Sequence, residues 1–119
     1  MLLAQSWQQA RDMDKAAQAY TEAARRTTAS GDADFRLGQI YIQQEKWQAA
    51  ATALGEALKK GSLSSPGRVQ LMLGMSHYYL GQHDQALAAI QASVCYRDVE
   101  KEALRWLQQL RAMPEAAWN

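Results

Sequence analysis

Residues 34–58 read D-F-R-L-G-Q-I-Y-I-Q-Q-E-K-W-Q-A-A-A-T-A-L-G-E-A-L, and this stretch decides the expected fold. Its apolar and small residues recur at helical spacing, with one helix ending near Gln44 and the next beginning at Trp47. Gly38 and Ala50 lie where the two helices would face each other, and their small size lets the two backbones approach closely. The stretch therefore predicts a pair of antiparallel helices.

The same pattern of residues occurs three times along the chain. A Leu and a small residue are followed by an aromatic residue or a histidine, then by an Ala and a larger apolar or aromatic residue. The three sets are Leu3-Ala4, Trp7, Ala16 and Tyr20; Leu37-Gly38, Tyr41, Ala50 and Leu54; and Leu73-Gly74, His77, Ala86 and Ile90. The two small residues are 12 positions apart in every set, and successive sets are 34 and 36 positions apart. Such a period is typical of helix pairs that stack into an array.

This spacing resembles that of the tetratricopeptide repeat (TPR) family over residues 1 to about 112. The resemblance implies an all-α fold, a right-handed superhelical array of three helix hairpins over about residues 1–30, 31–64 and 65–97. Residues 98–112 are expected to form a C-terminal capping helix with Leu104, Leu107 and Leu110 on its buried face, followed by a tail at 113–119. Seven helices are expected in all, over about residues 2–10, 14–26, 33–44, 47–60, 66–80, 85–94 and 98–112.

The first hairpin depends on a turn at Asp12 and Asp14, which would also cap its second helix. No capping residue precedes Leu2, so we expect either an array that continues upstream or a helix that frays at its start. An uncovered first helix carrying Leu2, Leu3 and Trp7 would expose apolar surface. Weak self-association through this end, or order gained with upstream residues, is therefore expected.

Composition limits the function classes. The chain has 119 residues, of which 48% are hydrophobic and 21% charged, values typical of one globular domain. Its net charge of +1 provides no global field that would attract nucleic acid or an anionic membrane. No apolar run reaches the roughly 18 residues of a membrane span, so direct membrane insertion is not expected. Cys95 is the single cysteine, which excludes an internal disulfide and a multi-cysteine zinc site and leaves the compartment open.

Catalytic chemistry is not indicated by the sequence. The two histidines, His77 and His83, occupy the positions of Tyr41 and Trp47 in the preceding unit, which favours a role in the core or groove wall. We find neither a nucleophile with a neighbouring base nor a glycine-rich phosphate loop. The sequence therefore predicts a protein that is not an enzyme and that has neither a cofactor nor a bound metal.

The resemblance implies a concave groove lined by the first helix of each pair, and a protein or peptide ligand in it. Outward-turned residues of these helices are the candidate binding residues: Arg36, Gln39, Ile42 and Gln43 in the second pair and Leu71, Met75, Tyr78 and Tyr79 in the third. Met75 and Tyr78 are expected to anchor the ligand and the two glutamines to orient it. The alternative for Met72 and Tyr79 is packing beneath the 98–112 helix. The alternative function is a structural array that self-associates through its exposed ends.

A narrower resemblance covers residues 57–87. With its turn from Gly61 to Gly67, this stretch is similar to the C-terminal repeats of bacterial periplasmic TPR proteins associated with TonB systems. That resemblance implies an exported parent protein that is accessory to TonB-dependent transport, whereas without it a cytoplasmic location is expected. Chaperone-binding TPR proteins instead use groove Lys, Asn and Arg residues, and this chain offers only Arg36 and Arg68 for a carboxylate.

Overall fold

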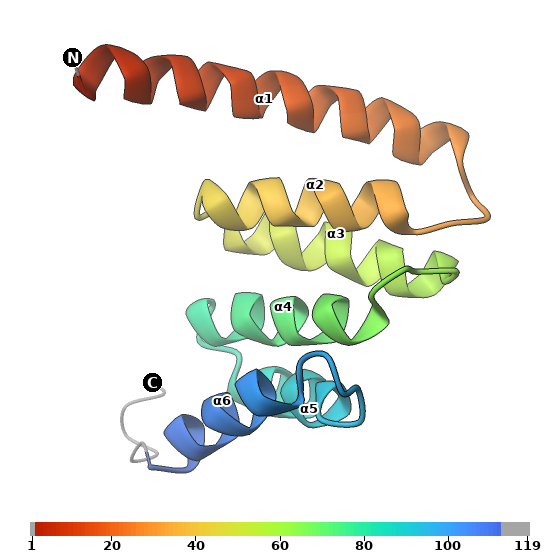
Figure 1. The fold of residues 1–119 in the computed structure, drawn as a ribbon, viewed down its shortest axis with the longest axis vertical. Coiled ribbons are helices and arrows are strands. Elements are labelled where there is room, and N and C mark those ends of the chain that lie inside the picture. The colour runs from red at the N-terminus through yellow and green to blue at the C-terminus, as the bar shows by residue number, and fades with distance from the viewer. Residues whose placement is uncertain (1, 113–119) are drawn as a thin grey trace.

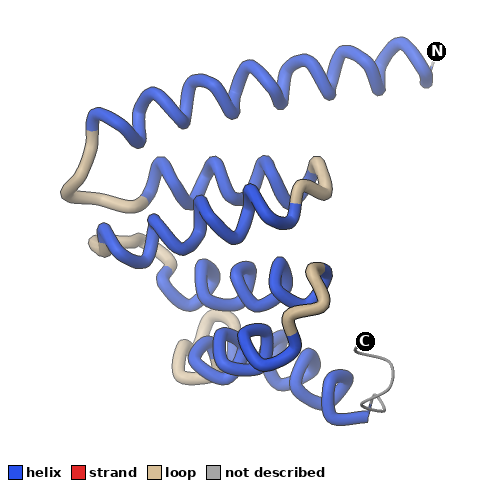
Figure 2. The backbone as a smooth tube through the Cα atoms, turned by 180° about the vertical axis from the view of Figure 1, so that it is seen from behind, coloured by secondary structure: helices blue, strands red, loops and turns tan. Residues whose placement is uncertain are grey.

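The structure, a computed structural model, describes residues 2–112, and side chains from residue 11 onward. The described residues form six helices and no strand: α1 Leu2–Arg26, α2 Asp32–Gln43, α3 Trp47–Lys60, α4 Pro66–Tyr79, α5 His83–Ser93 and α6 Glu100–Ala112. Figure 1 shows them stacked in chain order, and in Figure 2 the connecting loops lie at the two sides of the stack. The predicted all-α helical repeat array is confirmed.

The first 26 residues differ from the expectation. They form one unbroken helix rather than a hairpin, so the predicted turn at Asp12 and Asp14 is wrong. Asp14 accepts a hydrogen bond from Gln44 Nε2 at 2.7 Å, and it caps no helix. The two turns that do form contain a residue with positive φ, Glu45 in one and Gly81 in the other. No glycine or proline occurs among residues 10–14, and most residues around them favour helix, so the backbone ladder continues through this point.

The other two hairpins form as predicted, α2 with α3 and α4 with α5. A Cβ atom at Gly38 would lie 2.6 Å from Leu54 Cδ2, and one at Gly74 would overlap Ile90 Cγ1. Leu54 and Ile90 are completely buried. Small residues are therefore required at these two positions because the paired helices approach each other there.

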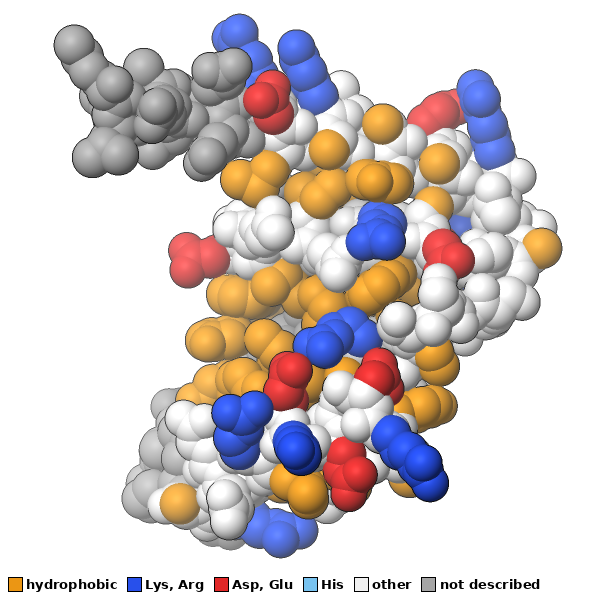
Figure 3. All heavy atoms as spheres, viewed as in Figure 1, with side chains coloured by type: hydrophobic (Ala, Val, Ile, Leu, Met, Phe, Trp, Pro, Cys, Tyr) orange, Lys and Arg blue, Asp and Glu red, His pale blue; other side chains and the backbone are white. Residues whose placement is uncertain are grey.

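The buried side chains form three clusters along the stack. The first joins Ala17, Leu37 and Ala53, and the second contains Phe35, Leu54, Ala57 and Val69. The third contains Leu71, Ile90, Val99, Ala103, Leu107 and Leu110. Figure 3 shows apolar side chains in bands between the helices. Each helix thus buries its apolar surface against its neighbours, as in repeat proteins.

Helix α6 covers the last hairpin, as expected of a cap. Leu107 and Leu110 are buried against α4 and α5, but Leu104, expected on the same face, is 47% exposed. Ala103 takes the buried position instead, because residues at i, i+4 and i+7 share a helix face more closely than residues at successive threes. Within residues 2–112, none of the helices combines the length and the apolarity that crossing a membrane requires.

Candidate functional site

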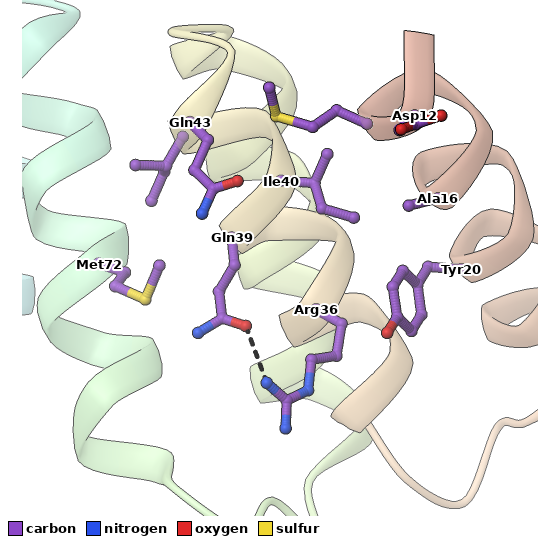
Figure 4. Close-up of a pocket in the computed structure, with 10 residues that line it drawn as sticks. Asp12, Ala16, Tyr20, Arg36, Gln39, Ile40, Gln43 and Met72 are labelled. Carbon is purple, nitrogen blue, oxygen red and sulfur yellow. Dashed lines mark hydrogen bonds between the residues drawn. The ribbon is translucent and has the colours of Figure 1, made fainter. Parts of the chain in front are cut away.

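A hollow of about 850 Å³ opens between α1, α2 and α4 (Figure 4). Helix α2 forms its floor, α1 one wall and α4 the opposite wall. The lining residues are Asp12, Met13, Ala16, Tyr20, Arg36, Gln39, Ile40, Ile42, Gln43 and Met72. The hollow is therefore built by two successive helices, α1 and α2, and by α4, which comes later in the sequence.

Polar side chains of α2 lie along the floor. Arg36, Gln39 and Gln43 are spaced at i, i+3 and i+7, so they project from one face of the helix. Arg36 Nη1 donates a hydrogen bond to Gln39 Oε1 at 3.3 Å. This bond orients the Gln39 side chain across the floor, while Gln43 is exposed to solvent. Two amides and one guanidinium are thus available to hydrogen-bond a ligand from one row.

The two walls are largely apolar. Ala16 and Tyr20 project from α1, and Met72 projects from α4 toward Gln39. The charges of the hollow are one carboxylate, Asp12 on α1, and one guanidinium, Arg36. These opposite charges leave the hollow without net charge, so it suits a ligand that combines apolar and hydrogen-bonding groups.

Half of the predicted binding residues meet in this hollow. Arg36, Gln39, Ile42 and Gln43 all line it. The four predicted residues of α4 do not, and Met72 is the residue of that helix that lines it. The alternative position for Met72, beneath α6, is wrong, because Met72 packs against the cluster formed by α2, α3 and α4.

The predicted residues of α4 serve other contacts. Leu71 is completely buried in the third cluster, so its prediction as a groove residue is wrong. Met75 and Tyr78 are half-buried against the same cluster. Tyr79 is 51% exposed and stacks on Trp47 of α3 with ring centroids 4.3 Å apart. The alternative position for Tyr79, beneath α6, is therefore also wrong.

These aromatic residues belong to one row that crosses three helices. Trp47 contacts Tyr79, Tyr79 contacts Tyr78 edge-on at 5.1 Å, and Tyr78 contacts Trp106 of α6 edge-on at 5.3 Å. The repeat pattern of α4 alone could not show this, because Trp47 and Trp106 come from helices outside it. The expected anchors of a ligand are thus partly engaged within the protein.

Sequence reasoning missed the contribution of α1 to the hollow. The repeat pattern predicts that Ala16 and Tyr20 are buried, yet both are only partly buried and line the hollow. The sequence has no decisive signal for this contribution, because residues 10–14 contain neither glycine nor proline but include Asp12 and Asp14, which also suit a turn. The repeat pattern also predicts that Gln5, Gln8 and Gln9 of the first helix face the groove. Their side chains, like the tail that contains Trp118, lie outside the part of the chain that the structure describes.

The two histidines lie at the end of α4 and at the start of α5. His77 Nδ1 lies 2.6 Å from Gln82 Oε1, which ties the end of α4 to the following turn. His83 begins α5 instead of lying in the turn before it, and Cys95 is exposed. In the part of the chain that the structure describes, no three His, Cys, Asp or Glu side chains gather as metal ligands would.

Antiparallel helix pairs stacked side by side define a helical repeat array. The tetratricopeptide repeat family model matches residues 1–66 and 71–117, so the chain belongs to this family. No curated protein matches the chain. Repeats of this family generally mediate protein–protein interaction, and family members are typically scaffolds without enzymatic activity.

Proposed function

We propose that this protein is a non-enzymatic scaffold that binds a protein segment in the hollow over α2. The observation that carries this proposal is the composition of the hollow, which places Gln39 and Gln43 between apolar walls. A peptide backbone needs donors and acceptors of this kind, and its side chains need apolar contacts. Because the glutamines project from a rigid helix, they require no refolding to receive a ligand.

Size and charge support a protein segment as the ligand. A hollow of about 850 Å³ that is open to solvent is large enough for several side chains. The net charge of the chain is +1, and the hollow carries one charge of each sign. Electrostatic attraction therefore contributes little, and we expect affinity to change little between low and moderate salt.

Selection of peptides from a displayed random library tests the proposal. Peptides selected on the folded chain should bind at least tenfold more weakly to Ile42→Asp, which places a charge in the hollow. Gln91→Ala, which removes an exposed amide from α5, is the matched control and should leave binding unchanged. Selected peptides that bind both variants as tightly as the parent would place the site elsewhere.

We also propose a finer role, accessory to TonB-dependent transport in a bacterial periplasm. This finer proposal rests only on the resemblance described for the sequence of residues 57–87. Under this role, a segment of a TonB-system protein should compete with the selected peptides for the hollow. The interaction of the parent chain and of Ile42→Asp with such segments can be measured by the same assay.

A further inference from the structure

The second half of α1 lacks the cover that its equivalents have in the other two hairpins. The positions compared are Ala16, Ala19, Tyr20 and Ala23 in α1, Ala50, Ala53, Leu54 and Ala57 in α3, and Ala86, Ala89, Ile90 and Ser93 in α5. All eight residues of α3 and α5 are buried, six of them completely. In α1, Ala19 and Ala23 are exposed, and Ala16 and Tyr20 are only partly buried. One buried face of the repeat is therefore open to solvent in this part of the molecule.

The first helix of each hairpin provides that cover elsewhere. Gly38 of α2 contacts Leu54 of α3, and Gly74 of α4 contacts Ile90 of α5. The equivalent contact of Tyr20 would come from position 4, where the sequence has Ala4. The order Leu3-Ala4 followed by Trp7 also matches the pattern of the two covering helices. Residues 2–10 thus have the sequence of the missing cover.

These residues cannot cover Tyr20 of their own chain in this structure. Ala4 and Tyr20 belong to the same unbroken helix, in which 16 residues span about 24 Å. Figure 1 shows the N-terminal half of α1 extending away from the loop that leads to α2. The uncovered face and the sequence that fits it are therefore held apart.

We propose that residues 2–10 of a second copy of this chain cover the open face of α1. Ala4 of that copy would lie against Tyr20, as Gly38 lies against Leu54, and Trp7 would approach Ala16. The inserted helix would occupy the α1 side of the hollow, lined by Ala16 and Tyr20. The inference goes beyond the proposed function. Because the hollow shares its α1 wall with this face, the inserted helix and the proposed ligand would compete for Ala16 and Tyr20.

Helix geometry determines how the copies connect. Successive residues of an α-helix turn by about 100°, which places positions 4 and 7 on the side of α1 opposite positions 16 and 20. Two straight α1 helices therefore cannot cover each other reciprocally, because the covering residues and the open face of one helix point in opposite directions. Each contact instead joins the first half of one α1 to the second half of the next, so the copies connect head to tail.

Disulfide trapping between two chains tests the occupant directly. Both chains carry Cys95→Ala; one also carries Ala4→Cys, and the other, which has a different tag, carries Tyr20→Cys. The close approach of Gly38 to Leu54 shows that this position pair is near enough for a disulfide in a formed hairpin. Mild oxidation of the mixture should give the mixed dimer as the main product. Gln91→Cys is the matched control for Tyr20→Cys, because Gln91 is exposed on α5 far from the open face, and it should give only background product.

One chain that carries both Ala4→Cys and Tyr20→Cys distinguishes the alternatives. An internal disulfide in a monomer at low concentration would mean that the segment folds back on its own chain, and it would overturn the proposal. Equal trapping at positions 20 and 91 would overturn it as well. These assays contain no ligand, so their failure would leave the proposed peptide site untouched.

Sedimentation of the chain without added cysteines is a second test, and it does not depend on whether the Tyr20→Cys variant folds. The average mass should rise with concentration and exceed that of a dimer. Trp7→Asp should weaken this association at least tenfold, whereas Ser6→Asp, about 100° around the helix from Trp7 and about 160° from Ala4, should change it less than twofold. A mass that stays at the monomer would overturn the proposal, and a plateau at the dimer would overturn the head-to-tail arrangement.

Discussion

Lys60 Nζ lies 2.8 Å from Asp34 Oδ2 and donates to the carbonyl oxygen of Ala24, also at 2.8 Å. The Asp34 side chain is 8% exposed and that of Lys60 17%. One ammonium group at the end of α3 therefore joins α2 and the end of α1 in a site with little solvent. An ion pair of this kind depends on both partners, because either charge left alone would be buried.

Removing one partner of this pair should destabilise the fold. Lys60→Met leaves the buried carboxylate of Asp34 without its partner, and we expect a loss of about 3 kcal/mol in the free energy of unfolding. Lys59→Met is the control, because Lys59 pairs with Glu56 at 3.5 Å on the surface and should cost less than about 1 kcal/mol. Urea unfolding of both variants measures the difference. Equal losses would contradict the expectation that the buried Lys60–Asp34 pair stabilises the fold more than the exposed Lys59–Glu56 pair.

The approach of α2 to α3 should depend on Gly38. Gly38→Leu must displace Leu54 and separate the helices, so we expect a loss of about 1–3 kcal/mol by overpacking. Gly55→Ala in α3 is the contrasting change, because a Cβ atom there meets nothing within 4 Å. It should stabilise the chain by about 0.5–1 kcal/mol through better helix propensity. Thermal unfolding should therefore shift in opposite directions for the two variants.

The capping role of α6 should appear in a comparison of two of its leucines. Leu107 is 6% exposed and packs in the third cluster, whereas Leu104 is 47% exposed. Leu107→Ala should cost about 2–4 kcal/mol, and Leu104→Ala less than about 1 kcal/mol. Denaturant unfolding of the two variants measures both values. Similar losses would mean that α6 does not seal the end of the stack.

The aromatic row predicts that Tyr78 is more important for stability than Tyr79. Tyr78 packs against the third cluster and against Trp106, so Tyr78→Ala should cost about 1–3 kcal/mol. Tyr79 has a stacked partner, Trp47, but is mostly exposed, and Tyr79→Ala should cost about 1 kcal/mol or less. Melting temperatures of the two variants decide the order. A Tyr78→Ala variant that melts with the parent would contradict the packing described for this row.

The hairpins α2–α3 and α4–α5 could be predicted because their sequence pattern has a local cause. Gly38 and Gly74 are small where a neighbouring helix comes close, and the contact partners follow at a constant spacing. The floor of the hollow was predictable for the same reason, since the outward face of α2 follows from helix periodicity. Where residues are small because two helices touch, the sequence pattern predicts those two helices.

Two features could not be predicted, for two different reasons. The continuity of α1 depends on residues 10–14, which support both a helix and a turn, and similar residues at Glu45 do form a turn. The burial of Leu71 and the engagement of Tyr78 depend on where α6 packs. Helix α6 lies outside the repeated pattern, so the sequence of α4 does not contain that information.

The division of the buried side chains into three successive clusters has a consequence for local opening. With no single central core, the helices depend on their immediate neighbours, and a disturbance at one end reaches the other only through the units between them. Amide protons of α1, which is covered on one side by α2, should exchange with solvent much faster than those of α4, which lies between α3 and α5. Partial unfolding should therefore begin at the α1 end and spread along the stack one helix at a time.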